Sequence, residues 1–308
     1  MKKLVSTLGM AKEEWLSYRK QGIGGSEAGA VCGLNPYRTP LQVYLDKTSG
    51  WAEDNDNEAM RQGRDLEEYV AKRFMEASGK KVRRANAMFY DPAHPFMLAD
   101  VDRMVVGENA GLECKTASPY MEGKWADGKV PPHYLAQCYH YMSVTGADAW
   151  YIALLVFGRE FKFYRIDRDN QLVSNLIQLE QCFWENHVLK RVAPPPDGSK
   201  LDDPVIGDMF KDTSSMVVPL EGFDGKLQRR QELAEEISRM EVEKRRIEQE
   251  LKMYMGDAES AENENFRVSW KNVKSSRLDT KRLKAEEPLV YSKYCSVTSS
   301  RRLEVKAA

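Results

Sequence analysis

The sequence predicts a mixed α/β domain, followed by a helical arm and a small basic segment. Stretches rich in β-branched and aromatic residues alternate with stretches of helical periodicity over residues 1–190. Three consecutive prolines interrupt this pattern at 194–196. A long, highly charged stretch with regularly spaced apolar residues follows, which is typical of a long helix or a short coiled coil.

Local signals place the individual elements. We expect a Gly-rich turn over 22–26, an acidic loop over 52–58, and helices over 11–20, 39–50, 60–79, 132–145 and 170–190. Gly79 provides the stop of the third helix, and two prolines open the fourth. Strands are expected over 81–90, 96–106, 110–116, 149–158 and 160–166, with the last two forming a hairpin.

The chain divides into two parts around the prolines. We expect a first domain over 1–192, a Pro-rich linker over 193–205, and a helical or coiled-coil arm with a basic end over 206–308. Within the arm, a helix over 222–255 carries a heptad-like row interrupted by Lys244; its apolar members are Leu233, Ile237, Met240, Ile247 and Leu251. The alternative is one long surface helix that lies on the first domain.

Composition excludes several classes of protein. The five cysteines are scattered without a CxxC pair, which argues against a disulfide framework and against a zinc site. The four histidines show no ligand spacing, so we expect them to be structural or on the surface. The sequence has neither an apolar run of membrane-spanning length nor a signal peptide, which favours the cytoplasm and no membrane partner.

The end of the chain is basic although the formal net charge of the whole chain is −1. Residues 266–306 carry eleven basic and four acidic side chains, a net charge of +7. Aromatic residues lie among these charges: Phe266, Trp270, Tyr291 and Tyr294. This pattern suits a surface that binds double-stranded DNA. It also suits an ordinary small domain with a solvated basic face.

Four charges on two neighbouring strands form the most informative constellation. Asp100 and Asp102 share one face of their expected strand, and Glu113 and Lys115 share a face of the next, because side chains alternate along a strand. Two carboxylates can hold Mg²⁺, and a lysine can orient a water molecule and offset developing negative charge on a phosphate. The alternative is a solvent-facing strand with paired charges, since E-x-K alone is a weak motif.

Two helices carry polar residues on otherwise apolar faces. Glu67 lies on the same helix face as Val70 and Phe74, at i, i+3 and i+7. We therefore expect its carboxylate to be partly buried, which is unfavourable unless it is paired or bound to a metal. Gln137 shares a helix face with two tyrosines. It could reach an active site or could be a satisfied amide in the core.

The turn GIGGS at 22–26 has two readings. Glycines let backbone N–H groups approach an anion, and the following helix N-terminus favours a phosphate. Ser26 could contact that phosphate, or it could simply cap the helix.

The order of these motifs resembles the YqaJ-like viral recombinase family, which is related to lambda exonuclease and belongs to the PD-(D/E)XK nucleases. The resemblance covers most of residues 15–190. It rests on YRKQGIGGSEAGAVCGLNPYRTP, GRDLEE, ADVDRMV, LECKT and HYLAQCYHYM. Their order and spacing are specific together, although each is weak alone.

The resemblance implies a PD-(D/E)XK core with a mixed central sheet flanked by helices. It implies Mg²⁺-dependent cleavage of duplex DNA ends, commonly 5′→3′, with Mn²⁺ as a substitute, in phage-type recombination. It also implies a single-strand annealing protein as partner, a bacterial host cell, and possible homo-oligomers. The matching catalytic positions are Asp102, Glu113 and Lys115, with Glu67 near the metals, Gln137 after the core strands, and Arg19 and Ser26 at the terminal phosphate; the metal ligands among them are Glu67, Asp102 and Glu113.

Two positions depart from the family pattern. Val101 stands where the motif has proline, which a strand tolerates. Asp100 stands where lambda exonuclease has a serine that contacts the terminal phosphate. A carboxylate there would repel a phosphate or add a metal ligand. An endonuclease of the same superfamily, or an inactive DNA-binding recombination adaptor, are the alternatives to an exonuclease.

Overall fold

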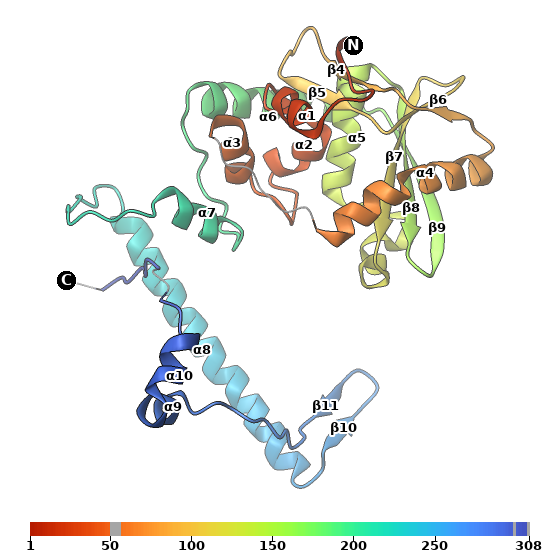
Figure 1. Ribbon diagram of the computed structural model, residues 1–308. Coiled ribbons are helices and arrows are strands. Elements are labelled where there is room, and N and C mark those ends of the chain that lie inside the picture. The colour runs from red at the N-terminus through yellow and green to blue at the C-terminus, as the bar shows by residue number, and fades with distance from the viewer. Residues whose placement is uncertain (50–56, 298–299, 307–308) are drawn as a thin grey trace. The chain divides into compact units, whose positions relative to one another are not determined.

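The computed structural model describes residues 1–49, 57–297 and 300–306. The expected acidic loop over 52–58 lies largely outside these residues. The chain forms two compact units, Met1–Phe210 and Lys211–Ala308 (Figure 1).

The first unit contains the helices and strands that the sequence predicted, with several changed boundaries. Its helices are α1 (Lys12–Arg19), α2 (Gly25–Val31), α3 (Pro40–Thr48), α4 (Glu58–Ser78), η1 (Pro119–Gly128), α5 (Pro132–Thr145), α6 (Asn170–Phe183), η2 (Trp184–Leu189) and α7 (Asp202–Met209). Its strands are β1 (Lys2–Ser6), β2 (Ile23–Gly24), β3 (Val82–Arg83), β4 (Ala87–Tyr90), β5 (Met97–Asp100), β6 (Arg103–Val105), β7 (Ala110–Ala117), β8 (Ala149–Val156) and β9 (Glu160–Asp167).

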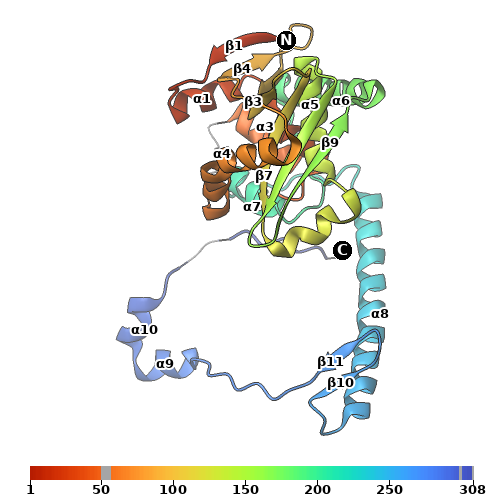
Figure 2. The same cartoon turned by 90° about the vertical axis from the view of Figure 1, so that its right-hand side faces the viewer.

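The larger of the two sheets in this unit is mixed, as expected. Its order is β3-β6-β7-β8-β9, in which β7 and β8 are parallel and the other pairs are antiparallel. The β8–β9 hairpin confirms the expected pairing of the last two strands. Figures 1 and 2 show β7, β8 and β9 side by side between helices. The smaller sheet has the order β1-β4-β5-β2.

Alternation along β8 places α4 and α5 on opposite faces of the larger sheet. Trp150 and Ile152 belong to the apolar cluster that includes α5. Tyr151 and Ala153 belong to the cluster that includes α4 through Phe74. Because side chains alternate along a strand, the two helices cover the two faces. The α5 face also receives Glu113, which is one residue from Leu112 of the α4 cluster.

Two expected strands are each divided between the two sheets. The segment 81–90 forms β3 in the larger sheet and β4 in the smaller one. The segment 96–106 forms β5 in the smaller sheet and β6 in the larger one, with a break at Val101 and Asp102. The expectation of one continuous strand across 96–106 was therefore wrong, because the two halves pair with different partners.

The first unit ends later than the sequence analysis placed it. It extends to Phe210, beyond the expected boundary at 192. Helix α7 begins inside the segment that we assigned to the linker, and its Asp202 and Val205 are buried. The hydroxyl of Thr39 donates a hydrogen bond of 2.6 Å to Asp202. This contact attaches α7 to α3, whose N-cap is Thr39.

The second unit contains one long helix and a set of short elements. These are α8 (Asp224–Met255), β10 (Ser260–Glu262), β11 (Arg267–Ser269), α9 (Thr280–Glu286) and α10 (Pro288–Tyr294). Helix α8 closely matches the helix expected over 222–255. Within the described parts of both units, no helix combines the length and the apolar character needed to cross a membrane.

A buried ion pair joins three elements of the first unit. His140 on α5 and Glu180 on α6 are both fully buried. The imidazole Nδ1 lies 2.9 Å from a carboxylate oxygen of Glu180, and Nε2 lies 2.8 Å from the carbonyl oxygen of Leu98 on β5. Both ring nitrogens face acceptors, so the imidazolium satisfies both contacts. Burial alone would lower the pKa of His140, but Glu180 and the Leu98 carbonyl raise it.

We expect His140→Leu to lower the free energy of unfolding by about 3–5 kcal/mol, because it leaves the Glu180 carboxylate buried without a partner. Urea unfolding followed by tryptophan fluorescence measures this change. The double variant His140→Leu/Glu180→Leu is the control, since it removes both charges and should recover much of the loss. Equal losses in the two variants would contradict an ion pair.

The same pair gives wild-type stability a defined pH dependence. A histidine whose pKa is raised by folding contributes its full stability below its unfolded-state pKa of about 6.5. We expect this contribution to fall as the pH rises through the higher folded-state pKa. Unfolding curves across neutral and mildly alkaline pH should show the decline in wild type and lose this component in the double variant.

Candidate active site

Asp102 lies where the chain passes from the smaller sheet to the larger one. Its carboxylate accepts a hydrogen bond of 2.8 Å from the backbone N–H of Cys114 on β7. Burial, followed by the nearby carboxylates of Glu113 and Glu67, raises the pKa of Asp102 well above its ordinary value. The position therefore concentrates negative charge that a cation would stabilise.

Glu113 is held on the α5 face of β7 by two side chains. Its Oε1 accepts hydrogen bonds from Lys115 Nζ at 2.6 Å and from Gln137 Nε2 at 2.7 Å. Gln137 also donates to the hydroxyl of Tyr141 at 3.0 Å. The other oxygen, Oε2, is buried and has no hydrogen-bond partner in the described chain. A buried carboxylate oxygen with a free coordination position is suited to a cation.

Lys115 lies between Glu113 and an aromatic ring. Its Nζ lies 4.8 Å from the ring centroid of Tyr134 on α5. Burial by itself would lower the pKa of Lys115, but Glu113, Tyr134 and Asp102 raise it. The ammonium form is therefore stabilised, and the expected shared face of Glu113 and Lys115 is present.

Glu67 approaches from α4 and does not join the two other carboxylates in a close cluster. Its Oε1 accepts a hydrogen bond of 2.5 Å from Arg103, which also donates to the Asp102 carbonyl at 2.7 Å and to Glu68 at 2.9 Å. Among the residues that the structure describes, no three acidic, histidine or cysteine side chains are grouped closely enough to hold a metal ion. The structure thus brings Asp102 near Glu113, and pairs Glu67 with a buried arginine.

A polar cavity of about 170 Å³ opens beside Asp102. It is lined by Thr7, Glu67, Arg84, Asn86, Asp100, Val101, Asp102 and Arg103. The expected pair Asp100 and Asp102 therefore borders one space, although Asp102 lies outside any strand. Asp100 accepts a hydrogen bond of 2.6 Å from the indole N–H of Trp15, and burial raises the pKa of its carboxyl.

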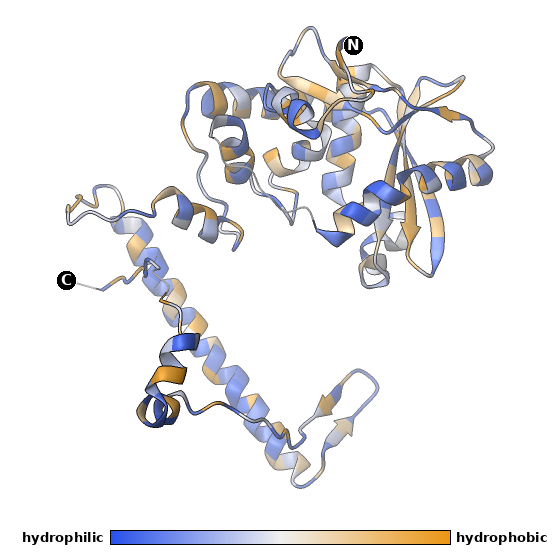
Figure 3. Ribbon diagram, in the orientation of Figure 1, coloured by the Kyte–Doolittle hydropathy of each residue, from blue (hydrophilic) through white to orange (hydrophobic). Residues whose placement is uncertain are grey.

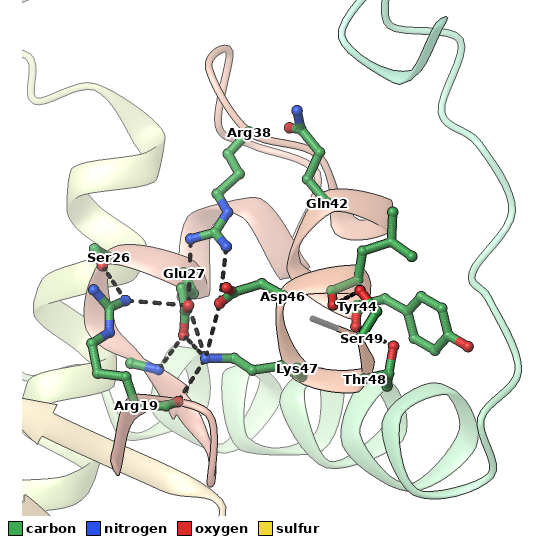
Figure 4. A network of polar contacts seen from close by, with 12 residues as sticks. Arg19, Ser26, Glu27, Arg38, Gln42, Tyr44, Asp46, Lys47, Thr48 and Ser49 are labelled. Carbon is green, nitrogen blue, oxygen red and sulfur yellow. Dashed lines mark hydrogen bonds and ion pairs between the residues drawn. The ribbon is translucent and has the colours of Figure 1, made fainter. Parts of the chain in front are cut away.

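Arg19 and Ser26 are joined directly in the structure. Arg19 Nη2 donates to the hydroxyl of Ser26 at 3.0 Å and forms an ion pair of 3.2 Å with Glu27 (Figure 4). The helix N-cap is Gly24, and the carboxylate of Glu27 accepts a hydrogen bond from its N–H at 2.8 Å. The alternative that Ser26 only caps α2 was therefore wrong, because Ser26 lies one residue inside the helix.

A buried carboxylate organises the basic side chains around Arg19. Glu27 is 1% exposed and contacts Lys47 at 2.8 Å and Arg38 at 3.3 Å in addition to Arg19. Burial would raise the pKa of Glu27, but the three cations lower it. Asp46 pairs with Arg38 at 3.3 Å. The cluster therefore contains three cations and two carboxylates.

Gly25 of GIGGS permits close packing against α5. A Cβ on Gly25 would lie 2.4 Å from Tyr141, whose hydroxyl accepts the hydrogen bond from Gln137. No side chain fits in that space without displacing one or both helices. The turn thus connects the cluster around Glu27 to the residues around Glu113.

Sequence reasoning missed three participants. Arg103 follows Asp102 directly, and a charge inside a short apolar strand was an available signal. Glu27 lies in the first turn of a helix of small residues, where a buried acid was not expected. Trp15 reaches Asp100 across 85 positions of sequence, and no local signal indicates that contact.

The chain is similar to known proteins in sequence and in fold. The sequence profile of the YqaJ-like viral recombinase domain matches residues 14–148. The uncharacterized protein YqaJ of Bacillus subtilis (strain 168) is 38% identical over 302 residues, which cover 96% of this chain and 95% of that protein. The chain belongs to the YqaJ family. The expected resemblance is thereby confirmed.

Solved structures show the fold of the first unit. An alkaline exonuclease from Laribacter hongkongensis aligns with a TM-score of 0.52 at 20% identity, covering 59% of this chain and 94% of that one. The complex of that exonuclease with dAMP aligns with a TM-score of 0.50 at 19% identity, with the same coverage. This YqaJ-family chain therefore has the PD-(D/E)XK-type mixed α/β fold that the sequence predicted.

Proposed function

We propose that this YqaJ-family protein is a metal-dependent DNA exonuclease. In this proposal it hydrolyses phosphodiester bonds at duplex ends, in the 5′→3′ direction, and leaves single-stranded DNA for phage-type recombination. The observation that carries the proposal is the arrangement of Asp102, Glu113 and Lys115, in which two carboxylates and an ammonium group meet at the junction of the sheets. Family membership and fold add support.

Asp102 and Glu113 would hold Mg²⁺, or Mn²⁺ in its place. The donor set fits a hard cation, because both groups are oxygen donors and Glu113 keeps one buried oxygen without a partner. A bound cation of this kind supplies Lewis-acid polarisation of a phosphate and acidifies a bound water. Glu67 would contribute through its second oxygen while Oε1 stays paired with Arg103, so we assign Glu67 a weaker share.

Lys115 and Gln137 would complete the site in different ways. The raised pKa of Lys115 keeps its ammonium charged, which suits it to orient a water and to offset negative charge on the phosphate. Gln137 fixes the rotamer of Glu113 through its 2.7 Å hydrogen bond. Arg19 and Ser26, joined by their 3.0 Å hydrogen bond, would contact the terminal phosphate of the DNA.

Duplex DNA and a protein partner complete the proposal. The +7 charge of residues 266–306 supports binding of double-stranded DNA through phosphate contacts. A single-strand annealing protein would take over the product strand, as recombination of this type requires. Homo-oligomers that encircle DNA are a further part of the proposal.

The decisive experiment is digestion of linear, nicked-circular and covalently closed circular duplex DNA, with a different label at each end of the linear substrate. An exonuclease of the proposed polarity releases the 5′ label of linear DNA first and leaves circles without ends intact. Internal cuts in covalently closed circles would favour an endonuclease of the same superfamily. Binding without any cleavage in Mg²⁺ or Mn²⁺ would favour an inactive recombination adaptor.

We expect Lys115→Ala to lower the single-turnover cleavage rate by about 10²–10³-fold while DNA affinity changes little, because charge compensation in the transition state is lost. The measurement uses saturating Mg²⁺. Lys72→Ala is the matched control, since Lys72 is an exposed lysine on α4. A wild-type rate in Lys115→Ala would remove this residue from the site.

Asp102→Asn and Glu113→Gln should each weaken Mg²⁺ binding, because a neutral amide replaces an anionic ligand. Glu67→Gln should weaken it less, since Glu67 pairs with Arg103. Calorimetric titration with Mg²⁺ and Mn²⁺ measures the affinities, and Glu76→Gln, at an exposed glutamate of the same helix, is the control. Unchanged affinity in all three variants would move the metal site elsewhere.

Asp100 should weaken any preference for a 5′-phosphorylated end, because its carboxylate lies on the cavity beside Asp102 and would repel a phosphate. We expect Asp100→Ser and Asp100→Asn to increase the ratio of cleavage rates for 5′-phosphate over 5′-hydroxyl substrates. The asparagine variant keeps an acceptor for Trp15 and thereby isolates the charge. A strong preference for the phosphate in wild type would contradict this argument.

A further inference from the structure

Helix α8 presents a row of exposed apolar side chains with coiled-coil spacing. The row, called the α8 seam, consists of Leu233, Ile237, Met240, Ile247 and Leu251, which are 39–65% exposed. Their spacing corresponds to alternating d and a positions of a heptad, with Lys244 at the one interrupted a position. Figure 3 shows hydrophobic residues recurring along the otherwise hydrophilic helix. An exposed row of this kind is typical of a helix that pairs with another helix.

The charges of α8 are sorted relative to the α8 seam. The e and g positions that border it are all acidic between Ala234 and Leu251; they are Glu236, Glu241, Glu243, Glu248 and Glu250. The opposite face is mainly basic, with Glu232 and Glu235 near its N-terminal end; its basic residues are Arg239, Arg245, Arg246 and Lys252. A random mixture of charges would place both signs beside the seam. The arrangement therefore specifies a partner by charge as well as by shape.

Pairing of two α8 helices would bring like charges together. In a parallel pair, the g position of one helix faces the e position of the next heptad of the other, so Glu236 would meet Glu241 and Glu243 would meet Glu248. In an antiparallel pair, e faces e and g faces g, and glutamates again face glutamates. Two copies of Lys244 would also meet in an in-register parallel pair. Each such contact is unfavourable, so the pattern argues against a second copy as the occupant.

We propose that the α8 seam binds an amphipathic helix of another protein, with apolar residues at its a and d positions and Lys or Arg at its e and g positions. An acidic or polar residue of that helix would face Lys244. The ion pairs within α8, such as Lys244 with Glu248 at 3.7 Å and Arg246 with Glu250 at 3.8 Å, are exposed and weak, so the glutamates are available for exchange. The seam spans about 27 Å at 1.5 Å per residue, which suits a reversible complex. This proposal does not depend on the nuclease activity.

The test uses the full-length protein and two synthetic helical peptides that differ only in flanking charge. Both peptides carry leucine and isoleucine at a and d and a glutamate to face Lys244. The basic peptide has lysine at e and g, and the acidic peptide has glutamate there. Fluorescence anisotropy should show the basic peptide binding at least about tenfold more tightly, and the difference should shrink at high salt.

Charge reversal on α8 is expected to reverse the peptide preference and not merely to weaken binding. A variant that failed to fold would not give that result. The triple variant Glu241→Lys/Glu243→Lys/Glu248→Lys should reverse the preference, so that the acidic peptide binds more tightly. Ile247→Asp should abolish binding of both peptides, whereas Arg245→Asp, on the opposite face, should not weaken binding of the basic peptide. Circular dichroism checks that each variant keeps its helix content.

Four outcomes would overturn the proposal. Equal binding of the two peptides would remove the charge argument. A dimer in light scattering that Ile247→Asp dissociates would make a second copy the occupant. Binding of the basic peptide only after removal of residues 264–308 would make the chain's own basic end the occupant. A lowered melting temperature of the first unit in Ile247→Asp would show that the seam packs on that unit.

Discussion

The candidate site depends on the passage of the chain from one sheet to the other at Val101 and Asp102. Strand β5 ends in the smaller sheet and β6 begins in the larger one. Asp102 lies between them and belongs to neither strand. Its carboxylate then accepts the N–H of Cys114, which lies between Glu113 and Lys115 on β7. This single hydrogen bond aligns the junction with the strand that carries the other two charged groups.

The first unit buries several charged side chains, and burial of a charge is unfavourable. Three of these side chains are paired with specific groups. Glu27 is surrounded by three cations, Arg103 by two glutamates and a carbonyl, and His140 by Glu180 and the carbonyl of Leu98. Removing one member of such a group leaves an unpaired buried charge, which is far more costly than the pair itself. Glu113 is also paired, but its buried Oε2 has no hydrogen-bond partner in the described chain.

The second unit follows another principle. Except for Met255, the apolar residues of α8 are not buried, and between Ala234 and Leu251 glutamates occupy the positions that border the α8 seam. Buried contacts between distant segments specify the fold of the first unit. In α8, by contrast, the apolar and charged side chains are exposed and available to a binding partner.

The sequence by itself determined the features that depend on local periodicity. The apolar spacing of Val70 and Phe74 and the left-handed Gly79 determined α4, and the heptad-like row determined α8. The E-x-K spacing was sufficient to place Glu113 and Lys115 on one face, because the two-residue repeat holds in any strand. Only the tertiary structure decided that 96–106 is two strands, that Gly24 caps α2, and that α7 packs beside Thr39. The divided strands and the packing of α7 each depend on a partner far away in the chain: a strand of another sheet, or the threonine hydroxyl that binds Asp202. The Gly24 cap is local, since Gly24 donates to Glu27, but the burial of Glu27 among three cations is not. Local sequence carries no information about which distant partner will be present, and burial against that partner is what selects the structure.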